Sequence, residues 1–210
     1  MVPDYLEKKL TDYVKNGGTL VSSYLLGMVN ENDLCHLDGW PCGELKNVFG
    51  IWNEEIDTLY RDEKQVVKFK DGSTYDAIDF CELVHAQGAE VMAEYDSDFY
   101  KGYPAVTVNK YGEGKAYYVT FRDGGIYTDR LIGEIVNELG ISSQFDGEIP
   151  DGVSVTSRLG DGETYVFFQN FNQRDIALKT ELNWSDVESD ATYSGTIDLK
   201  PLEVKILKKG

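Results

Sequence analysis

The fold of this chain is decided by residues 17–24, GGTLVSSY, where two glycines end a helix and a short apolar strand follows. Upstream, Pro3 at a helix start and apolar residues at helical spacing up to Val14 predict an amphipathic helix. Downstream, residues 29–34, VNENDL, form a polar loop at the carboxyl end of the strand. Open α/β sheets bind ligands or partners at that end of their strands, so the loop is a first candidate site.

The order of these elements predicts an incomplete α/β unit. A parallel sheet ordinarily opens with a strand, because parallel neighbours need a long crossover between them. This chain opens with a helix, which predicts that it begins inside a βαβ unit. The strand at 19–23 is then expected to lack one parallel neighbour that the complete unit would supply, to lie at an uncovered sheet edge and to promote self-association.

The rest of the chain falls into two parts that differ in composition and in the pattern of predicted elements. A short helix is predicted just before Gly50, and an amphipathic helix along 131–139 ends at Gly140. Strands are predicted at 51–59, 65–69, 74–78, 80–84, 89–95, 104–109 and 115–121, the last two as a hairpin. After a polar segment only short strands follow, at 153–159, 164–170, 176–182, 196–199 and 203–207. The sequence therefore predicts two domains, an α/β domain at 1–141 and an antiparallel β domain at 152–210.

Charge and composition exclude several kinds of partner. The chain has 37 acidic and 20 basic side chains, for a formal net charge of −17. The negative electrostatic field of this charge repels phosphates and anionic lipids, so we expect neither nucleic acid nor a membrane as a partner. No apolar run approaches the roughly 20 residues of a membrane span. Three cysteines fit a reducing compartment better than a disulfide framework, so we expect a cytoplasmic protein.

Carboxylates are abundant enough that a glycosidase-like pair has to be considered. A retaining pair needs two carboxyl groups about 5–5.5 Å apart, one of them kept protonated by its surroundings. Glu54 and Glu55 are neighbours on a predicted strand and are expected to face opposite sides of it. Asp76, Asp79 and Glu82 are expected to lie on a solvated edge or turn. Neither set predicts a catalytic pair.

Cysteine and histidine residues suggest zinc only weakly. They are Cys35, His36, Cys42, Cys81 and His85, and no Cys-x-x-Cys spacing occurs. Cys81 and His85 share one face of a predicted strand but lie about 13 Å apart along it, too far to bind one ion. We therefore expect no metal site, and no motif in the chain predicts a cofactor.

Two further patterns favour chemistry less than they first suggest. Cys35-His36 resembles the nucleophile and base of amidotransferase-like folds, but adjacent side chains rarely face each other and no Gly-x-Cys-x-Gly elbow occurs. Gly112-x-Gly114 is expected to be a hairpin turn. Gly124-Gly125 opens a helix without the complete Gly-x-Gly-x-x-Gly of a phosphate loop.

Tryptophans provide the candidate sugar-binding surface. Trp40, Trp52 and Trp184 could stack on sugar rings, although most aromatics are expected in the core or in an interface. The loop at 33–41 is polar and is expected to expose His36 and Trp40. Function and assembly often reside in long loops, so this loop is the site that the sequence favours.

Several sequence blocks, in order, resemble one known family. They are LTDYVKNGGTLV at 10–21, VNENDLCHLDGWP at 29–41, FGIWNEEID at 49–57, FCELVHAQGAEV at 80–91, YPAVTVN at 103–109 and GEGKAYYV at 112–119. With these blocks the chain resembles the part of a bacterial glycoside hydrolase family 42 β-galactosidase that follows the catalytic barrel. It departs from the family at residues 38–43, DGWPCG, where members more often have paired glycines, an aromatic, Pro-Gly and a leucine.

The resemblance implies a fold and a role for each part. In the family a catalytic (β/α)₈ barrel comes first, a flavodoxin-like, class I glutamine amidotransferase-like trimerisation domain second, and a small antiparallel β domain last. The chain then corresponds to most of the second domain and all of the third. Both catalytic glutamates of the family lie in the barrel, so the resemblance implies that no residue here is catalytic and that this chain alone is inactive.

The resemblance also implies partners and site residues. The middle domain of the family forms a homotrimer and contributes part of the wall of the catalytic pocket of a neighbouring barrel. The implied partners are therefore copies of this chain and the missing barrel. The galactoside is reached only through that parent enzyme, which hydrolyses terminal β-galactosides with retention. The residues implied as pocket wall or interface are Asn32, Asp33, His36, Trp40 and Trp52.

Two other functions stay open on the sequence alone. One is an autonomous amidotransferase-like enzyme or ligand-binding α/β domain, against which the missing nucleophile counts. The other is a carbohydrate-binding module built from the terminal β domain and Trp184.

Overall fold

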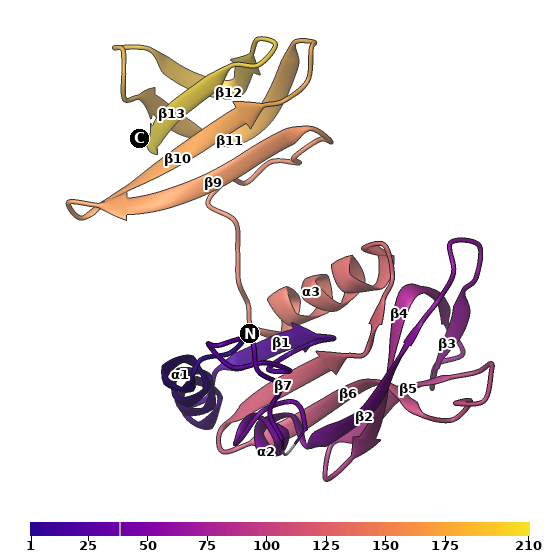
Figure 1. The fold of residues 1–210 in the computed structure, drawn as a ribbon. Helices are drawn as coiled ribbons and strands as arrows, with labels where there is room; N and C mark the ends of the chain where they lie inside the picture. The colour runs from indigo at the N-terminus through magenta and orange to yellow at the C-terminus, as the bar shows by residue number, and fades with distance from the viewer. Residues whose placement is uncertain (38) are drawn as a thin grey trace. The chain divides into compact units, whose positions relative to one another are not determined.

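The chain folds into two β-rich units, Met1–Glu134 and Ile135–Gly210, in a computed structural model that describes residues 1–37 and 39–210 (Figure 1). The elements of the first unit are α1 (Asp4–Lys15), β1 (Thr19–Ser23), α2 (Leu45–Phe49), β2 (Ile51–Thr58), β3 (Gln65–Phe69), β4 (Thr74–Ala86), β5 (Glu90–Tyr95), β6 (Pro104–Tyr111), β7 (Gly114–Val119) and β8 (Phe121–Arg122). Helix α3 (Ile126–Glu138) crosses the division. The second unit contains β9 (Val153–Gly160), β10 (Glu163–Asn170), β11 (Ile176–Asp186), β12 (Thr192–Leu199) and β13 (Val204–Lys209).

One sheet of eight strands forms the first unit. Its order is β1-β7-β6-β5-β3-β4-β2, with β8 paired to β4. Among the strands that the structure describes in this sheet, β1 and β7 are the one parallel pair, with Ser22 opposite Tyr118. All the other pairs are antiparallel.

The flavodoxin-like α/β fold predicted for residues 1–141 is therefore wrong. That fold needs helical crossovers between successive parallel strands, whereas the chain runs from β3 to β7 without a helix. Strands hold 46% of the residues and helices only 14%, so the fold is mainly β. The α/β expectation came from the helix and strand at the start of the chain, which is the one place where parallel pairing occurs. The amidotransferase-like alternative loses its basis with this fold.

Strand β4 bends and joins two parts of the sheet (Figure 1). Its first residues pair with β3, where Tyr75 lies opposite Val67, and its last residues pair with β2, where His85 lies opposite Trp52. Asp79 lies between these regions with a positive φ of 62°, and the pairing with β8 is irregular there. The sequence predicted two strands, 74–78 and 80–84, where the structure has one bent strand.

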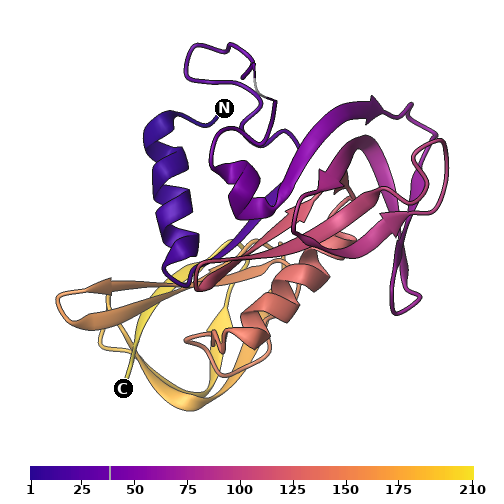
Figure 2. The same ribbon diagram turned by 90° about the horizontal axis from the view of Figure 1, so that it is seen from below.

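Helices cover both faces of this sheet. α1 and α2 lie on one face and α3 on the other (Figures 1 and 2). The core under α1 and α2 is apolar and includes Val14, Leu45, Val48, Phe49, Ile51, Val84, Ala116 and Tyr118. Helix α1 approaches the β6–β7 hairpin so closely that a Cβ at Gly114 would collide with the carbonyl oxygens of Val14 and Gly18. Close packing therefore explains why the second position of the Gly112-x-Gly114 pattern is a glycine.

The second unit is a five-stranded antiparallel sheet of order β12-β11-β13-β10-β9. Buried positions alternate along β10, as expected for a sheet with one covered face. The core contains Phe145, Phe168 and Trp184, and the ring centroids of Phe168 and Trp184 are 5.2 Å apart. Phe145 precedes the first strand, so the polar segment before β9 supplies one of the core anchors.

Candidate functional site

The connection between β1 and α2, residues 24–44, holds most of the predicted site residues. Its tip is a tight turn in which the Asn30 N–H donates to the Leu34 carbonyl oxygen at 2.9 Å. The Asn30 side-chain oxygen accepts hydrogen bonds from the N–H groups of Asn32 (2.9 Å) and Leu34 (3.2 Å). Asparagine favours such turns because its side chain hydrogen-bonds nearby backbone groups.

The predicted residues of the tip lie in different surroundings. Asn32 and Asp33 are exposed, and Asp33 has a left-handed φ of 58°. His36 is partly buried. Its backbone N–H donates to the Met28 carbonyl oxygen at 3.2 Å, and its ring Nε2 is buried without a partner among the described residues. The expectation of an exposed His36 is therefore wrong. Cys35 is exposed, whereas the Nε2 atom of His36 is buried.

Glu82 on β4 lies under this loop, with 0% of its surface exposed. Its Oε1 accepts hydrogen bonds from the Leu25 N–H at 2.7 Å and from the Trp40 Nε1–H at 3.2 Å. Its Oε2 accepts one from the Tyr118 hydroxyl at 2.8 Å. Trp40 is partly buried by this contact, not exposed as we expected. We name the carboxylate with these three donors the Glu82 clasp.

The prediction that Glu82 is solvated is also wrong. Asp76 and Asp79 are partly exposed and pair with Lys64 and Arg122 at 2.6 and 2.8 Å, as a solvated edge allows. Glu82 differs because a loop from far upstream covers it. A sequence signal existed: in the run FCELV at 80–84, Glu82 is the one charged residue among apolar neighbours.

The electrostatics of the Glu82 clasp follow from its burial. Burial raises the pKa of the Glu82 carboxyl, and the hydrogen bonds from Leu25, Tyr118 and Trp40 act in the opposite direction. Burial and the nearby Glu82 carboxylate raise the pKa of Tyr118 well above its ordinary value. The three donors are all neutral, so the carboxylate is held by hydrogen bonds and not by a countercharge.

Trp52 lies on the other face of β2 and β4 from the clasp. Its ring stacks on His85 with centroids 4.6 Å apart and planes 11° from parallel. Glu54 Oε2 lies 2.6 Å from His85 Nε2, and Tyr103 packs edge-on against the imidazole. A β-bulge between Asn53 and Glu55 replaces the regular alternation that we expected at Glu54. The structure therefore does not bring Trp40 and Trp52 into one site.

The cysteines lie apart from one another. Cys81 is buried on β4, where burial raises the pKa of its thiol to about 11. It lies near Tyr95, Tyr100 and Asp57, whereas His85 lies against Trp52. Within residues 1–37 and 39–210, the structure contains no group of three or more His, Cys, Asp or Glu side chains that could hold a metal ion.

The amino terminus of α3 is occupied by a side chain of the protein. The carboxylate of Asp123 accepts hydrogen bonds from the N–H groups of Gly125 (3.0 Å), Thr128 (2.8 Å) and Tyr127. Partial burial raises the pKa of Asp123, but the bonds from Thr128 and Gly125 outweigh it and lower the pKa overall. A phosphate at Gly124-Gly125 would need these same N–H groups.

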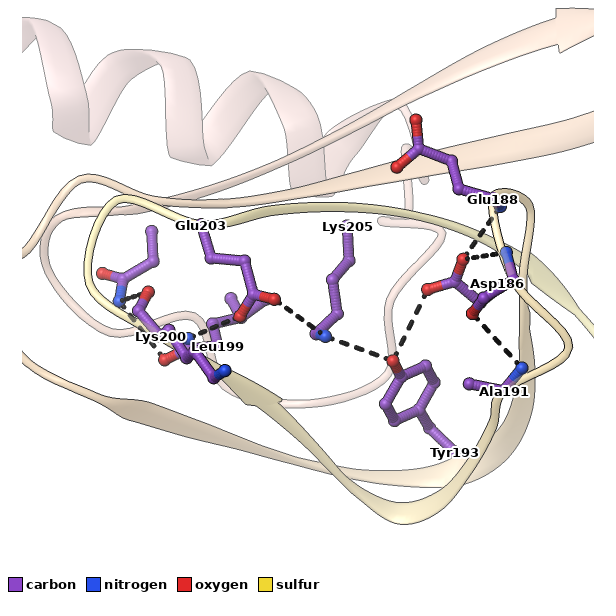
Figure 3. Close-up of polar contacts among 10 residues, drawn as sticks. Asp186, Glu188, Ala191, Tyr193, Leu199, Lys200, Glu203 and Lys205 are labelled. Atoms are coloured by element: carbon purple, nitrogen blue, oxygen red, sulfur yellow. Dashed lines mark hydrogen bonds and ion pairs between the residues drawn. The ribbon is translucent and has the colours of Figure 1, made fainter.

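The second unit has a polar network at the ends of its strands (Figure 3). Lys205 Nζ lies 3.1 Å from Glu203 Oε1 and donates to the Tyr193 hydroxyl at 3.1 Å. The Tyr193 hydroxyl reaches Asp186 Oδ2 at 3.5 Å. The network therefore connects β13, β12 and the end of β11.

Trp184 does not offer a face to a sugar. It is 0% exposed, and its Nε1–H donates to Thr180 Oγ1 at 3.1 Å inside the core. The carbohydrate-binding alternative thus loses the residue on which it depends.

Comparisons with known proteins agree with this arrangement. A family model described as the β-galactosidase trimerisation domain matches residues 1–142, and one described as the β-galactosidase C-terminal domain matches residues 152–209. β-Galactosidase Pbg of Clostridium perfringens is 37% identical over 217 residues, and β-galactosidase BgaA of a Planococcus species is 40% identical over 215. The crystal structure of the β-galactosidase from Bacillus circulans sp. alkalophilus matches with a TM-score of 0.88 at 35% identity.

The fold and the comparisons define a mixed-sheet oligomerisation domain followed by a small antiparallel β domain. The chain belongs to glycoside hydrolase family 42 and corresponds to the trimerisation and C-terminal domains of its β-galactosidases. All three alignments cover 100% of this chain, but only 31% of each curated relative and 32% of the crystallised chain. None of the helices that the structure describes is long and apolar enough to cross a membrane.

Proposed function

We propose that this chain is the oligomerisation and scaffold portion of a retaining β-galactosidase that hydrolyses terminal β-galactosides. The observation that carries the proposal is the pair of family matches, in order and covering nearly the whole chain, at 37–40% identity to two β-galactosidases. The parent enzyme supplies the catalytic (β/α)₈ barrel, and copies of this chain associate as a homotrimer. We place it in the cytoplasm, where its free cysteines suit a reducing environment.

The uses of the carboxylates support a scaffold role. Retaining hydrolysis needs two carboxyl groups about 5–5.5 Å apart beside the sugar. In the described residues, Glu82 holds a loop, Asp79 pairs with Arg122 and Asp123 caps α3. These side chains already have structural partners, which supports assigning both catalytic carboxylates to the parent barrel.

Two features of the first unit support self-association. β1 ends the strand order of its sheet, so one side of its backbone has no strand partner among residues 1–37 and 39–210. The loop that follows β1 exposes Leu34 and Leu37 at its tip. An unpaired strand edge and exposed apolar side chains both favour contact with another chain.

The site residues divide between two surfaces. We propose that Asn32, Asp33, His36 and Trp40 belong to the contact that walls a neighbouring catalytic pocket, because they lie in or at the base of one loop. Trp52 lies on the opposite face of β2 and β4 with His85, and we propose a separate interface role for it.

The oligomeric state tests this proposal. Light scattering of the purified chain at micromolar concentration is expected to give three times the chain mass, and a chromogenic β-galactoside should stay uncleaved above a buffer blank. A monomer argues against the assembly role, a dimer indicates pairing through the β1 edge instead, and hydrolysis that survives removal of host enzyme argues against the scaffold assignment. Leu37→Asp is expected to weaken the trimer, whereas Leu159→Asp, an equally drastic change on the exposed surface of β9, should leave it intact.

The domain boundaries remain a proposal, 1–141 and 152–210. Limited proteolysis is expected to cut first within the polar segment at 142–152. Phe145 is buried and Asp146 accepts hydrogen bonds from Thr180 (2.6 Å) and the Glu181 N–H (2.7 Å), so cleavage should avoid these two residues. A first cut within residues 131–139 or 153–170 contradicts the boundary.

A further inference from the structure

We propose that Glu82 is a positioning residue: one of its carboxylate oxygens joins the two ends of the 24–44 loop and fixes the loop on the sheet before any partner binds. The inference rests on the proposed function for what the loop contacts, but the clasp itself can be tested without a partner. No part of a catalytic reaction is assigned to Glu82.

The geometry of Oε1 carries the inference. Leu25 follows β1 at the start of the loop, and Trp40 lies near its end, yet both donate to this one oxygen, at 2.7 and 3.2 Å. Ordering the residues between two such points costs chain entropy, which the shared acceptor offsets in the free chain. The loop is therefore closed at its base by a non-covalent link.

Other contacts hold the same base. The Asn53 N–H donates to the Trp40 carbonyl oxygen at 2.8 Å, and the Val2 N–H donates to the Val29 carbonyl oxygen at 3.2 Å. Tyr118 on β7 donates to the second oxygen of Glu82 at 2.8 Å, so the clasp spans β4, β7 and both ends of the loop. The base is thus tied to three elements of the sheet.

The choice of a carboxylate follows from the number of donors. An ionised carboxylate offers about four lone-pair positions, enough for the three donors that meet here. An apolar side chain of similar size would leave the buried Tyr118 hydroxyl and the part-buried N–H groups of Leu25 and the Trp40 indole without this acceptor. The loop and the acidic side chain therefore depend on each other.

The consequence lies at the tip. Leu34 and Leu37 are exposed on a loop whose base is already ordered, so a partner that buries them does not have to order the base as well. When the clasp is lost, the loop should no longer hold Leu34 and Leu37 in one fixed arrangement.

Nuclear magnetic resonance of the indole N–H groups tests the clasp directly, because the chain has only three tryptophans. Trp40→Phe identifies the Trp40 peak. In Glu82→Ala this peak is expected to move, while the peaks of Trp52 and Trp184 stay. Glu82→Gln keeps an acceptor for Leu25 and Trp40, so it should restore the Trp40 peak toward its wild-type position.

Cleavage of the tip provides the second measurement. Loss of hydrogen bonds to a buried charged group should speed proteolysis within residues 29–37 by about tenfold in Glu82→Ala. Trp40→Phe, which removes one donor, should speed it less and serves as the test if Glu82→Ala does not fold. Glu55→Gln, an exposed acid on β2, is the matched surface control, and Val67→Ala, a buried change on β3, controls for general destabilisation.

Three results would overturn the inference. They are an unmoved Trp40 peak in folded Glu82→Ala, tip cleavage as slow as in the wild type in both clasp variants, and equal acceleration by Val67→Ala at matched loss of stability. A trimer that forms normally in Glu82→Ala while the tip opens would leave the clasp standing and count against the loop as the trimer contact. A monomeric wild type with an intact clasp would instead remove only the proposed function.

Discussion

The first unit buries a carboxylate beneath a loop, whereas the second keeps its charged network near the ends of its strands. Glu82 is 0% exposed, but the side chains of Lys205 and Glu203 retain exposures of 16% and 28%. The difference follows from how each sheet is covered. Loops and helices from elsewhere in the chain cover the sheet of the first unit and have to be attached to it, while the strands of the second unit attach to one another.

The largest effect is expected in the apolar core of the second unit. Trp184→Ala should lower the free energy of unfolding by about 3–5 kcal/mol, as for other buried aromatic side chains. It leaves a cavity beside Phe145 and Phe168. Urea unfolding followed by circular dichroism measures the change, with the partly exposed Trp52→Ala as the control. A smaller loss for Trp184 than for Trp52 would contradict the core described above.

The next effect contrasts the two acidic side chains directly. Glu82→Ala should lower the free energy of unfolding by about 3 kcal/mol, because one buried and two part-buried donors lose their acceptor at roughly 1 kcal/mol each. Glu203→Ala in the second unit should cost less, about 1 kcal/mol, because its ion pair with Lys205 keeps partial access to solvent. The same urea unfolding experiment compares them, and equal losses would remove the contrast between the units.

The smallest effect is in the dependence of stability on pH. Burial raises the pKa of Glu82 above 4.5, so its contribution to stability is fully present below pH 4.5 and is lost as the pH rises through the folded-state pKa. The free energy of unfolding of the wild type should therefore fall relative to that of Glu82→Gln as the pH rises above 4.5.

Asp123 provides a control of opposite sign. Its pKa is lowered from 3.8, so its contribution is present above that pH and is lost as the pH falls through the lower folded-state value. Relative to Asp123→Asn, the wild type should lose stability on acidification. Unfolding by urea across the pH series measures both, and parallel profiles for the wild type and Glu82→Gln would contradict the buried carboxylate.

Local signals in the sequence located most elements. The strands at 19–23 and 65–69 match β1 and β3 at both ends, because glycines and turn residues bound them. The short helix before Gly50 is α2, and the predicted hairpin is β6 and β7, which pair from Val106 to Tyr111. These features depend on a few consecutive residues, so the local sequence is sufficient to predict them.

Features that depend on distant residues were missed. Sheet order and strand direction depend on pairings between segments far apart, and one helix-strand unit at residues 4–23 suggested a parallel sheet that the rest of the chain does not form. The burial of Glu82 depends on Leu25 and Trp40, which lie 57 and 42 residues upstream. For the same reason, the sequence could not show that Trp40 and Trp52 belong to opposite faces of β2 and β4.

The closed base of the 24–44 loop makes its tip exchangeable. Because Leu25 and Trp40 both donate to one oxygen of Glu82, we expect β1 and β2 to keep their places when residues 30–37 are lengthened or replaced. Each doubling of a flexible loop costs only about 0.6 kcal/mol in closure entropy. Peptides grafted at this position would be displayed from a rigid sheet, which gives the unit the properties of a scaffold for engineered recognition.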